Sequence, residues 1–203
     1  MKKKTMYKII ILIIFTFILP TVKIPPQDIE GWKILNEKEP WVGYVEYENF
    51  PWCRATDIFP YSINEIEQFI GKFDTYSNTF SRMIDSDLVD TNVVYLRVDY
   101  PFFLSDRDYL VKYRRLTDNK DVYYKWIAEV HPEVPEYDNV VRLINAGGEW
   151  ALKYISDNST KVSYSWNGEL RGDFPSFSLN SAWNKAGTEI INELRHAIEN
   201  SSK

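Results

Sequence analysis

The chain has 203 residues, of which 44% are hydrophobic and 26% charged, which suits one globular domain with a short extension rather than a disordered chain. Five of its 24 Lys and Arg residues lie in residues 1–23, where there is no acid, so the remaining 19 face 29 Asp and Glu residues and give the body a net charge of −10. A body this acidic repels phosphate backbones, which excludes nucleic-acid binding as a function.

Residues that bind metals or form disulfides are scarce, whereas aromatic residues are abundant. Cys53 is the single cysteine, so no intramolecular disulfide is possible, and its aromatic setting indicates a small buried side chain rather than a nucleophile. Two His residues without zinc-type spacing predict no structural metal, and nothing in the sequence predicts a cofactor. Seven Trp, 14 Tyr and 11 Phe make up 16% of the chain, which suits a thick core or a lined pocket.

The chain begins with a basic segment, Met1 to Lys8, followed by an unbroken apolar run from Ile9 to Leu19. This run is too short for a spanning helix, which needs about 20 residues, and is typical of a signal peptide. The next residues, TVKIPPQ, lack the small residues of a cleavage site, so removal of the segment and its retention as an anchor both stay open. We expect residues 1–27 to form a signal peptide or membrane anchor with a short proline-containing spacer, and residues 28–203 to form the domain. The domain would then be exported, as a periplasmic or secreted protein, or tethered to the membrane.

The first part of the domain predicts a β-hairpin followed by short helices. Alternating side chains over residues 41–48 and 52–59 predict two strands joined by a tight link. Ser62 and Glu65 have the spacing of a capping box, and the apolar positions that follow predict a helix ending at Gly71. A shorter helix or turn is expected over residues 74–80.

The rest of the domain predicts antiparallel strands and then one long helix. Period-two patterns indicate strands over residues 92–100, 107–115, 122–130, 139–144, 149–155 and 161–166. One face of such a sheet needs a cover. An amphipathic helix after Pro175, with Glu189, Asn192, Glu193 and Arg195 facing water, would supply it through Leu179, Trp183, Ala186, Ile190, Leu194 and Ala197. The predicted fold class is α+β, a curved antiparallel sheet wrapped around a long C-terminal helix with a hydrophobic cavity between them.

Several strings, in this order along the chain, resemble the START family of StAR-related lipid transfer domains. They are PFFLSDRDYLVKYRR at residues 101–115, VVRLINAGGEWALKYI at 140–155 and GDFP at 172–175, and Trp32 resembles the tryptophan that opens the domain. The resemblance implies a helix-grip fold whose cavity holds a lipid or another hydrophobic molecule, as in simple bacterial members. Tyr76 replaces a tryptophan of the family, and Tyr113 stands where steroid-handling members often have a basic residue, so cholesterol is not implied.

Cavity-facing positions of the strands and the last helix supply the candidate ligand contacts. Arg107 and Arg142 are each open to two interpretations, a polar contact to the ligand or a structural ion pair, which for Arg107 would involve Asp106 or Asp108. Loops 130–138 and 173–177 are expected to form the mouth, with Phe174 and Phe177 touching the membrane. The aromatic candidates for the cavity walls are Tyr109, Tyr113, Tyr124, Trp126, Trp150, Tyr164, Trp166 and Trp183.

Three functions are compatible with this pattern. The leading one is a monomeric carrier that binds a lipid or other hydrophobic small molecule at a membrane surface without catalysis, because no Ser-His-Asp or Cys-His arrangement, phosphate-binding Gly loop or HExxH motif occurs. The second is a polyketide aromatase or cyclase-like enzyme of the same fold, with Arg107, Tyr113 and Arg142 as acid–base candidates. The third is a membrane-tethered scaffold whose cavity is filled by its own aromatic residues.

Overall fold

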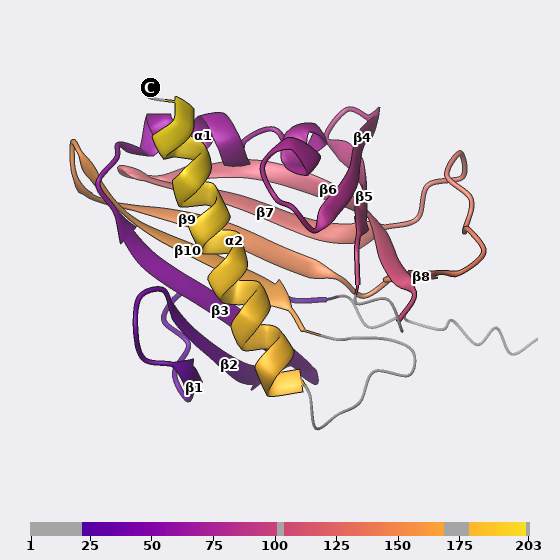
Figure 1. The fold of residues 1–203 in the computed structure, drawn as a ribbon, viewed down its shortest axis with the longest axis horizontal. Helices are drawn as coiled ribbons and strands as arrows, with labels where there is room; N and C mark the ends of the chain where they lie inside the picture. Colours follow the sequence, from indigo (N-terminus) through magenta and orange to yellow (C-terminus); the bar gives the residue numbers. More distant parts are fainter. Residues whose placement is uncertain (1–21, 101–103, 169–178, 202–203) are drawn as a thin grey trace, which may run out of the picture.

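Ten strands form one curved, mostly antiparallel sheet that wraps around a long helix (Figure 1). The computed structural model describes residues 22–100, 104–168 and 179–201. The strands pair in the order β1-β2-β3-β10-β9-β7-β6-β5-β4, and β8 pairs in parallel with β6. The strands are β1 Lys33–Asn36, β2 Trp41–Tyr47, β3 Phe50–Phe59, β4 Met83–Asp90, β5 Val93–Val98, β6 Asp106–Asp118, β7 Asp121–Glu129, β8 Val140–Arg142, β9 Gly147–Ser156 and β10 Ser159–Asn167.

Two short helices connect the first hairpin to the rest of the sheet. Helix α1 spans Ile63–Ile70, and the 3₁₀ helix η1 spans Phe73–Asn78. The predicted capping box is confirmed: the Glu65 amide donates to Ser62 Oγ at 3.4 Å, and the Ser62 amide donates to Glu65 Oε2 at 2.7 Å. These bonds satisfy backbone donors at the helix start, which fixes where the chain leaves β3.

Helix α2, Leu179–Ser201, lies across the concave face of the sheet and covers the core (Figure 1). The α+β helix-grip prediction is therefore confirmed. The buried face of α2 consists of Trp183, Gly187, Ile191, Leu194 and Ile198. The predicted stripe is confirmed in direction: Trp183 and Leu194 are buried, and Leu179, Ala186, Ile190 and Ala197 are partly buried. The prediction left out Gly187, Ile191 and Ile198, which are also buried.

Two strands were missed in the sequence, and both lie at the edges of the sheet. Strand β1 is short, and its register with β2 shifts between Ile34 and Asn36. Strand β4 has two register irregularities against β5 and exposes Ile84 and Leu88. Bulged edge strands lose the regular alternation that marks a strand in a sequence, which explains why they were missed.

The segment before β1 packs against the outer face of the sheet. Val22, Ile24 and Ile29 contact a cluster formed by Val45, Phe50 and Trp52. Residues predicted to form a spacer are thus packed against the domain in the described part of the chain. Within the described ranges, no helix is both long and apolar enough to cross a bilayer.

Candidate functional site: a cavity between sheet and helix

A cavity of about 270 Å³ lies between the concave face of the sheet and the N-terminal half of α2. Its floor comes from β5, β6, β7 and β10, and its other wall comes from α2, so its lining depends on contacts that are distant in sequence. The lining residues are Phe80, Arg82, Met83, Val98, Asp99, Tyr100, Arg107, Tyr109, Trp126, Leu143, Ala146, Tyr164, Trp166, Asn167, Gly168, Ala182, Trp183, Lys185, Ala186, Glu189, Ile190 and Glu193.

Six of the ten candidate ligand contacts line this cavity: Arg107, Tyr109, Trp126, Tyr164, Trp166 and Trp183. Four of the five aromatic members are stacked in two pairs. Tyr109 and Trp126 lie with ring centroids 5.6 Å apart at 8°, and Tyr164 and Trp166 lie 5.4 Å apart at 17°. Rings held in this way present flat and stiff apolar walls. Their contact with a ligand stays a prediction.

Three other aromatic candidates share the concave face but lie away from the cavity lining. The Tyr113 ring stacks on Phe73 of η1 at 4.3 Å. The Tyr124 hydroxyl donates to Glu67 of α1 at 2.8 Å. Trp150 is fully buried, and its ring centroid lies 4.4 Å from that of Tyr164, which is on the cavity side. The alternation of the strands identified their face correctly, but η1 and α1 cover that face beyond the end of the cavity.

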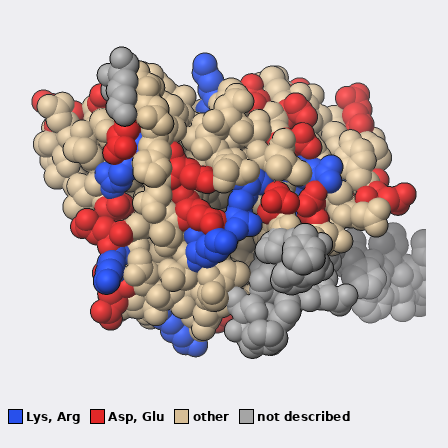
Figure 2. Space-filling model, in the orientation of Figure 1, with Lys and Arg blue, Asp and Glu red and all other residues tan. Residues whose placement is uncertain are grey.

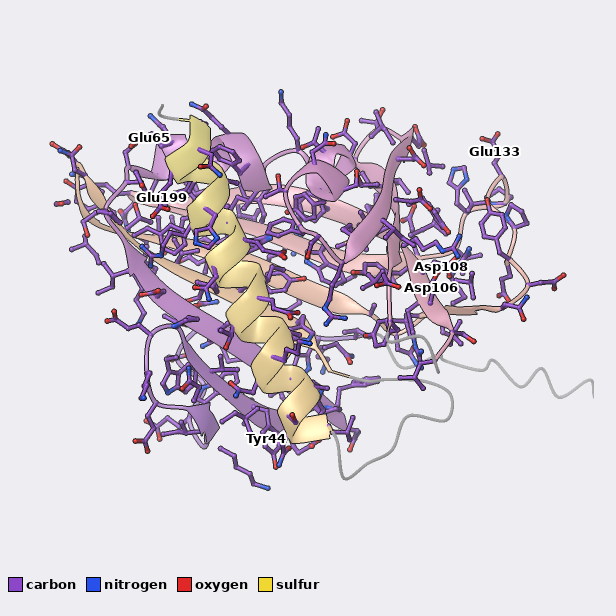
Figure 3. All side chains as sticks on the ribbon, in the orientation of Figure 1. Tyr44, Glu65, Asp106, Asp108, Glu133 and Glu199 are labelled. Carbon is purple, nitrogen blue, oxygen red and sulfur yellow. The ribbon has the colours of Figure 1, made fainter. Side chains whose placement is uncertain are left out.

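Arg142 also lies outside the cavity lining, because it belongs to a buried ion pair. Its Nε and its second terminal nitrogen donate to the two carboxylate oxygens of Asp108 at 2.7 and 2.9 Å. Asp108 is 1% exposed and the Arg142 side chain 9%. This pairing corresponds to the structural interpretation of Arg142 that the sequence left open, and it joins β8 to β6 near the end of the sheet where Figure 3 places Asp108.

Arg107 is the buried cation of the cavity lining, with 1% of its surface exposed. Its guanidinium carbon lies 4.5 Å from the centre of the Tyr100 ring, and it donates to the Ser105 carbonyl. The two carboxylates proposed as its ion-pair partners are paired with other arginines, Asp106 with Arg97 and Asp108 with Arg142. A cation and a ring at the cavity surface give a bound molecule a place for a polar group.

The tyrosines of the lining are neutral hydrogen-bonding groups. Burial raises the pKa of Tyr109 well above its ordinary value, and the nearby Tyr164 and Tyr100 hydroxyls raise it further. Burial likewise raises the pKa of Tyr164, and Tyr100 adds to that effect. These phenols therefore stay protonated at neutral pH and offer both a donor and an acceptor to a ligand.

Charged side chains cross the rim of the cavity between α2 and the loop before β4. Arg82 Nε donates to Glu189 at 2.7 Å, and the Ser81 amide donates to Glu193 at 3.1 Å. Figure 2 shows acidic and basic side chains meeting beside α2 on this face. We call Ser81, Arg82, Glu189 and Glu193 the rim latch. The sequence predicted Glu189 and Glu193 to face water, and the Glu189 side chain is 33% exposed. What the sequence did not indicate is their partners, which lie about a hundred residues away along the chain.

The sequence placed the mouth of the cavity at two loops, residues 130–138 and 173–177. Of the two loops predicted for the mouth, residues 130–138 contribute no side chain to the lining, although Leu143 just beyond them does. Residues 173–177, with Phe174 and Phe177, lie outside the described residues. In the described ranges, no group of three or more His, Cys, Asp or Glu side chains is arranged to hold a metal ion.

Solved structures with the same arrangement identify the fold. The STAR-related lipid transfer protein of Xanthomonas axonopodis (fragment 25–204) superposes with a TM-score of 0.72 at 18% identity, covering 84% of this chain and 99% of that one. The human StAR-related lipid transfer protein 5 gives a TM-score of 0.73 at 16% identity, covering 87% and 90%. The chain has the START fold.

The resemblance seen in the sequence strings is thus confirmed at the level of the fold. A START superfamily protein of Mycobacterium smegmatis is also similar, with a TM-score of 0.56 at 10% identity over 73% of this chain and 97% of that one. No protein-family model and no curated protein matches the sequence. The likeness to START proteins is therefore a likeness of backbone fold, at 10–18% sequence identity.

Proposed function

We propose that this START-fold chain binds one lipid or similar hydrophobic molecule in its cavity and carries it without catalysis. The observation that supports this most directly is the cavity itself, about 270 Å³ between sheet and helix and walled by stacked aromatic rings. An engineered apolar cavity of about 150 Å³ holds benzene, and binding sites for small molecules begin at about 300 Å³. The cavity lies between these two values and close to the larger one, so it suits a short acyl chain or a compact ring system, and it argues against a scaffold whose cavity is filled.

The polar groups of the lining would fix the orientation of the bound molecule. Arg107 and the hydroxyls of Tyr109 and Tyr164 come from β6 and β10, among the aromatic side chains of the lining. A ligand with one polar end matches this distribution, because burying a polar group is tolerated only where hydrogen bonds replace those to water. Each methylene of its apolar part would contribute about 0.8 kcal/mol.

Binding without chemistry is favoured over the cyclase-like alternative. Two of the three acid–base candidates, Tyr113 and Arg142, lie away from the lining, in a ring stack and an ion pair. The lining tyrosines have raised pKa values, and a general base must lose its proton near the operating pH. Incubation with a polyketone substrate and analysis by mass spectrometry would reveal turnover, which would contradict the carrier proposal.

We also propose that the monomeric carrier acts at a membrane on the exported side of the cell. The support comes from the basic start and the apolar run of residues 9–19. Fractionation of cells, with sequencing of the N-terminus of the protein, tests this. Recovery of the protein in the cytosol would contradict it.

Native mass spectrometry is the direct test of binding. Residues 22–203, purified from a lipid-containing host, should carry a reproducible adduct that solvent extraction releases as one class of molecule. A bare mass, with no uptake from added lipid mixtures, would overturn the proposal.

A matched pair of variants tests whether the cavity holds the adduct. Ala186 lines the cavity, whereas His196 is exposed on the same helix. Ala186→Phe places a ring in the binding volume and should reduce occupancy by about tenfold or more. His196→Phe adds the same ring outside and should leave occupancy unchanged. Equal occupancy in both variants would show that the molecule binds elsewhere.

A further inference from the structure

A second pocket, of about 330 Å³, lies on the opposite, outer face of the sheet. Side chains alternate between the two faces of a strand, so this pocket and the lipid cavity lie on opposite faces of the sheet. Thr56 and Ser163 line it, whereas their neighbours Ala55, Val162 and Tyr164 point into the core. The complete lining is Gln27, Trp32, Trp41, Arg54, Thr56, Lys153, Lys161 and Ser163. It contains three cations and no acidic residue, in a body whose net charge is −10.

The guanidinium of Arg54 forms the buried end of this pocket. Arg54 is 7% exposed, and its nitrogens donate to neutral oxygens: Ser165 Oγ at 2.8 Å and the Gln27 carbonyl at 3.0 Å. Its guanidinium carbon lies 4.7 Å from the centre of the Trp32 ring. Buried charges are normally paired. The nearby carboxylate of Glu149 attracts Arg54, but it also forms an ion pair with Lys125 at 3.0 Å and accepts from Gln27. One carboxylate therefore faces two cations, and with Lys153 and Lys161 the pocket keeps an excess of positive charge.

The two lysines face each other across neighbouring strands. Lys161 of β10 is the direct register partner of Lys153 of β9. Like charges placed directly opposite destabilise a sheet. Among the described residues, no carboxylate forms an ion pair with either ammonium group. An anion bound between them would remove this repulsion.

The remaining lining supplies hydroxyl groups and aromatic surface. Thr56 Oγ1 and Ser163 Oγ lie 2.9 Å apart on adjacent strands. Trp32 and Trp41 meet edge to face, with ring centroids 5.8 Å apart. Guanidinium, ammonium and hydroxyl donors around one space are the groups that bind phosphate oxygens, and Trp rings pack against the organic part of an ester.

We infer that this outer pocket binds the phosphate group of a phosphate ester, supplied by a lipid head group or by a free phosphorylated small molecule. It is independent of the proposed cargo cavity, since the sheet separates the two. The packed segment of residues 22–29 contributes Gln27 to the pocket and its carbonyl to Arg54. Occupancy would therefore also stabilise the attachment of this segment to the domain.

The test uses the full chain in a non-ionic detergent and the fluorescence of its tryptophans. Inorganic phosphate and glycerol phosphate are titrated in one arm. Mixed micelles of the same detergent with phosphatidylcholine, with or without phosphatidic acid, are added in the other. A saturable response that weakens with added salt is expected in at least one arm. Phosphate or glycerol phosphate acting alone indicates a free ester, and a response only to phosphatidic acid indicates a head group.

The variant Lys153→Gln/Lys161→Gln should weaken this response by at least about tenfold. The control, Lys112→Gln/Lys120→Gln, makes the same change of charge at two exposed lysines outside the pocket and should respond like the native chain. A second measurement needs no ligand: in phosphate-free buffer the Lys153/Lys161 variant should melt at a higher temperature than the native chain, because the repulsion is gone. Absence of a saturable response in both arms, or equal loss in both variants, would overturn the inference.

Discussion

The buried ion pair of Asp108 and Arg142 holds the end of the sheet next to the cavity. Arg142 also donates to the Pro135 carbonyl at 3.0 Å, and the Leu143 amide donates to the Asp108 carbonyl at 2.8 Å. Leu143 lines the cavity, so the pair ties β8 and one part of the cavity wall to β6. Replacement of Asp108 by Asn tests how strongly this tie contributes to the fold.

The expected size follows from burial. Asp108→Asn leaves the Arg142 guanidinium largely buried without a countercharge, because the side chains are only 1% and 9% exposed. Breaking a buried pair from one side costs about 3–5 kcal/mol. At this chain length, 1 kcal/mol lowers the melting temperature by about 2–4 °C, so a loss of about 10 °C is expected. Asp106→Asn is the matched control on the same strand. Its pair with Arg97 is 20% and 34% exposed, and its loss should be below about 1 kcal/mol.

Urea unfolding followed by circular dichroism and tryptophan fluorescence measures both variants. The double variant Asp108→Asn/Arg142→Met should be more stable than Asp108→Asn alone, since it leaves no buried cation without a countercharge. The reasoning is refuted if Asp108→Asn lowers the free energy of unfolding no more than Asp106→Asn does. It is also refuted if the loss in the double variant equals the sum of the losses in Asp108→Asn and in Arg142→Met measured separately.

Three further changes probe the rim, a buried phenol and the helix contact. Glu189→Gln removes the charge that holds Arg82 in the rim latch and should speed the release of a fluorescent fatty acid; an unchanged rate would contradict a role of the latch in access. Burial, followed by the hydrogen bond to Glu67, raises the pKa of Tyr124 from 10.0 to about 12. The neutral phenol therefore stabilises the fold up to about pH 10, and this stabilisation is lost as the pH rises towards 12. Tyr124→Phe should make the free energy of unfolding, measured with urea, fall less steeply between about pH 10 and 12. Gly187→Val should lower stability by about 1–3 kcal/mol, because three neighbours lie 3.0–3.2 Å from the position of an added Cβ; full stability would show that the helix shifts freely.

The sequence predicted the fold well where short-range patterns decide the structure. Regular alternation identified the central strands, and the spacing of Ser62 and Glu65 fixed the start of α1. It failed at the edges. In β4, Ser86 is buried because it binds Ser77 of η1 at 2.8 Å, while Leu88 is exposed. Such a strand shows no apolar alternation, because its environment is set by a neighbouring element rather than by the core.

The candidate site was predicted in part, for a related reason. Alternation shows which face of the sheet a residue occupies, and this placed Arg107 and Tyr109 correctly on the concave face. It does not show how far along a 13-residue strand the cavity extends. Tyr113 lies on the same strand and meets η1 instead. The partners of Glu189 and Glu193 depend on the packing of α2 against the loop before β4, which no local pattern indicates.

The size of the side chains on α2 explains where the cavity lies. At Gly187 the helix approaches the sheet so closely that an added Cβ would lie 3.0 Å from Val42. On the adjoining face Ala182 and Ala186 line the cavity, and their methyl groups leave open the volume that larger side chains would fill. The hydropathy pattern of the sequence does not distinguish these two faces of α2, because alanine scores as apolar and glycine as nearly neutral whatever space each leaves. The space between helix and sheet is therefore set by the order of small and large residues along α2. Two variants should separate ligand binding from stability: Ala186→Phe lowers the occupancy of the cavity, whereas Gly187→Val lowers the free energy of unfolding.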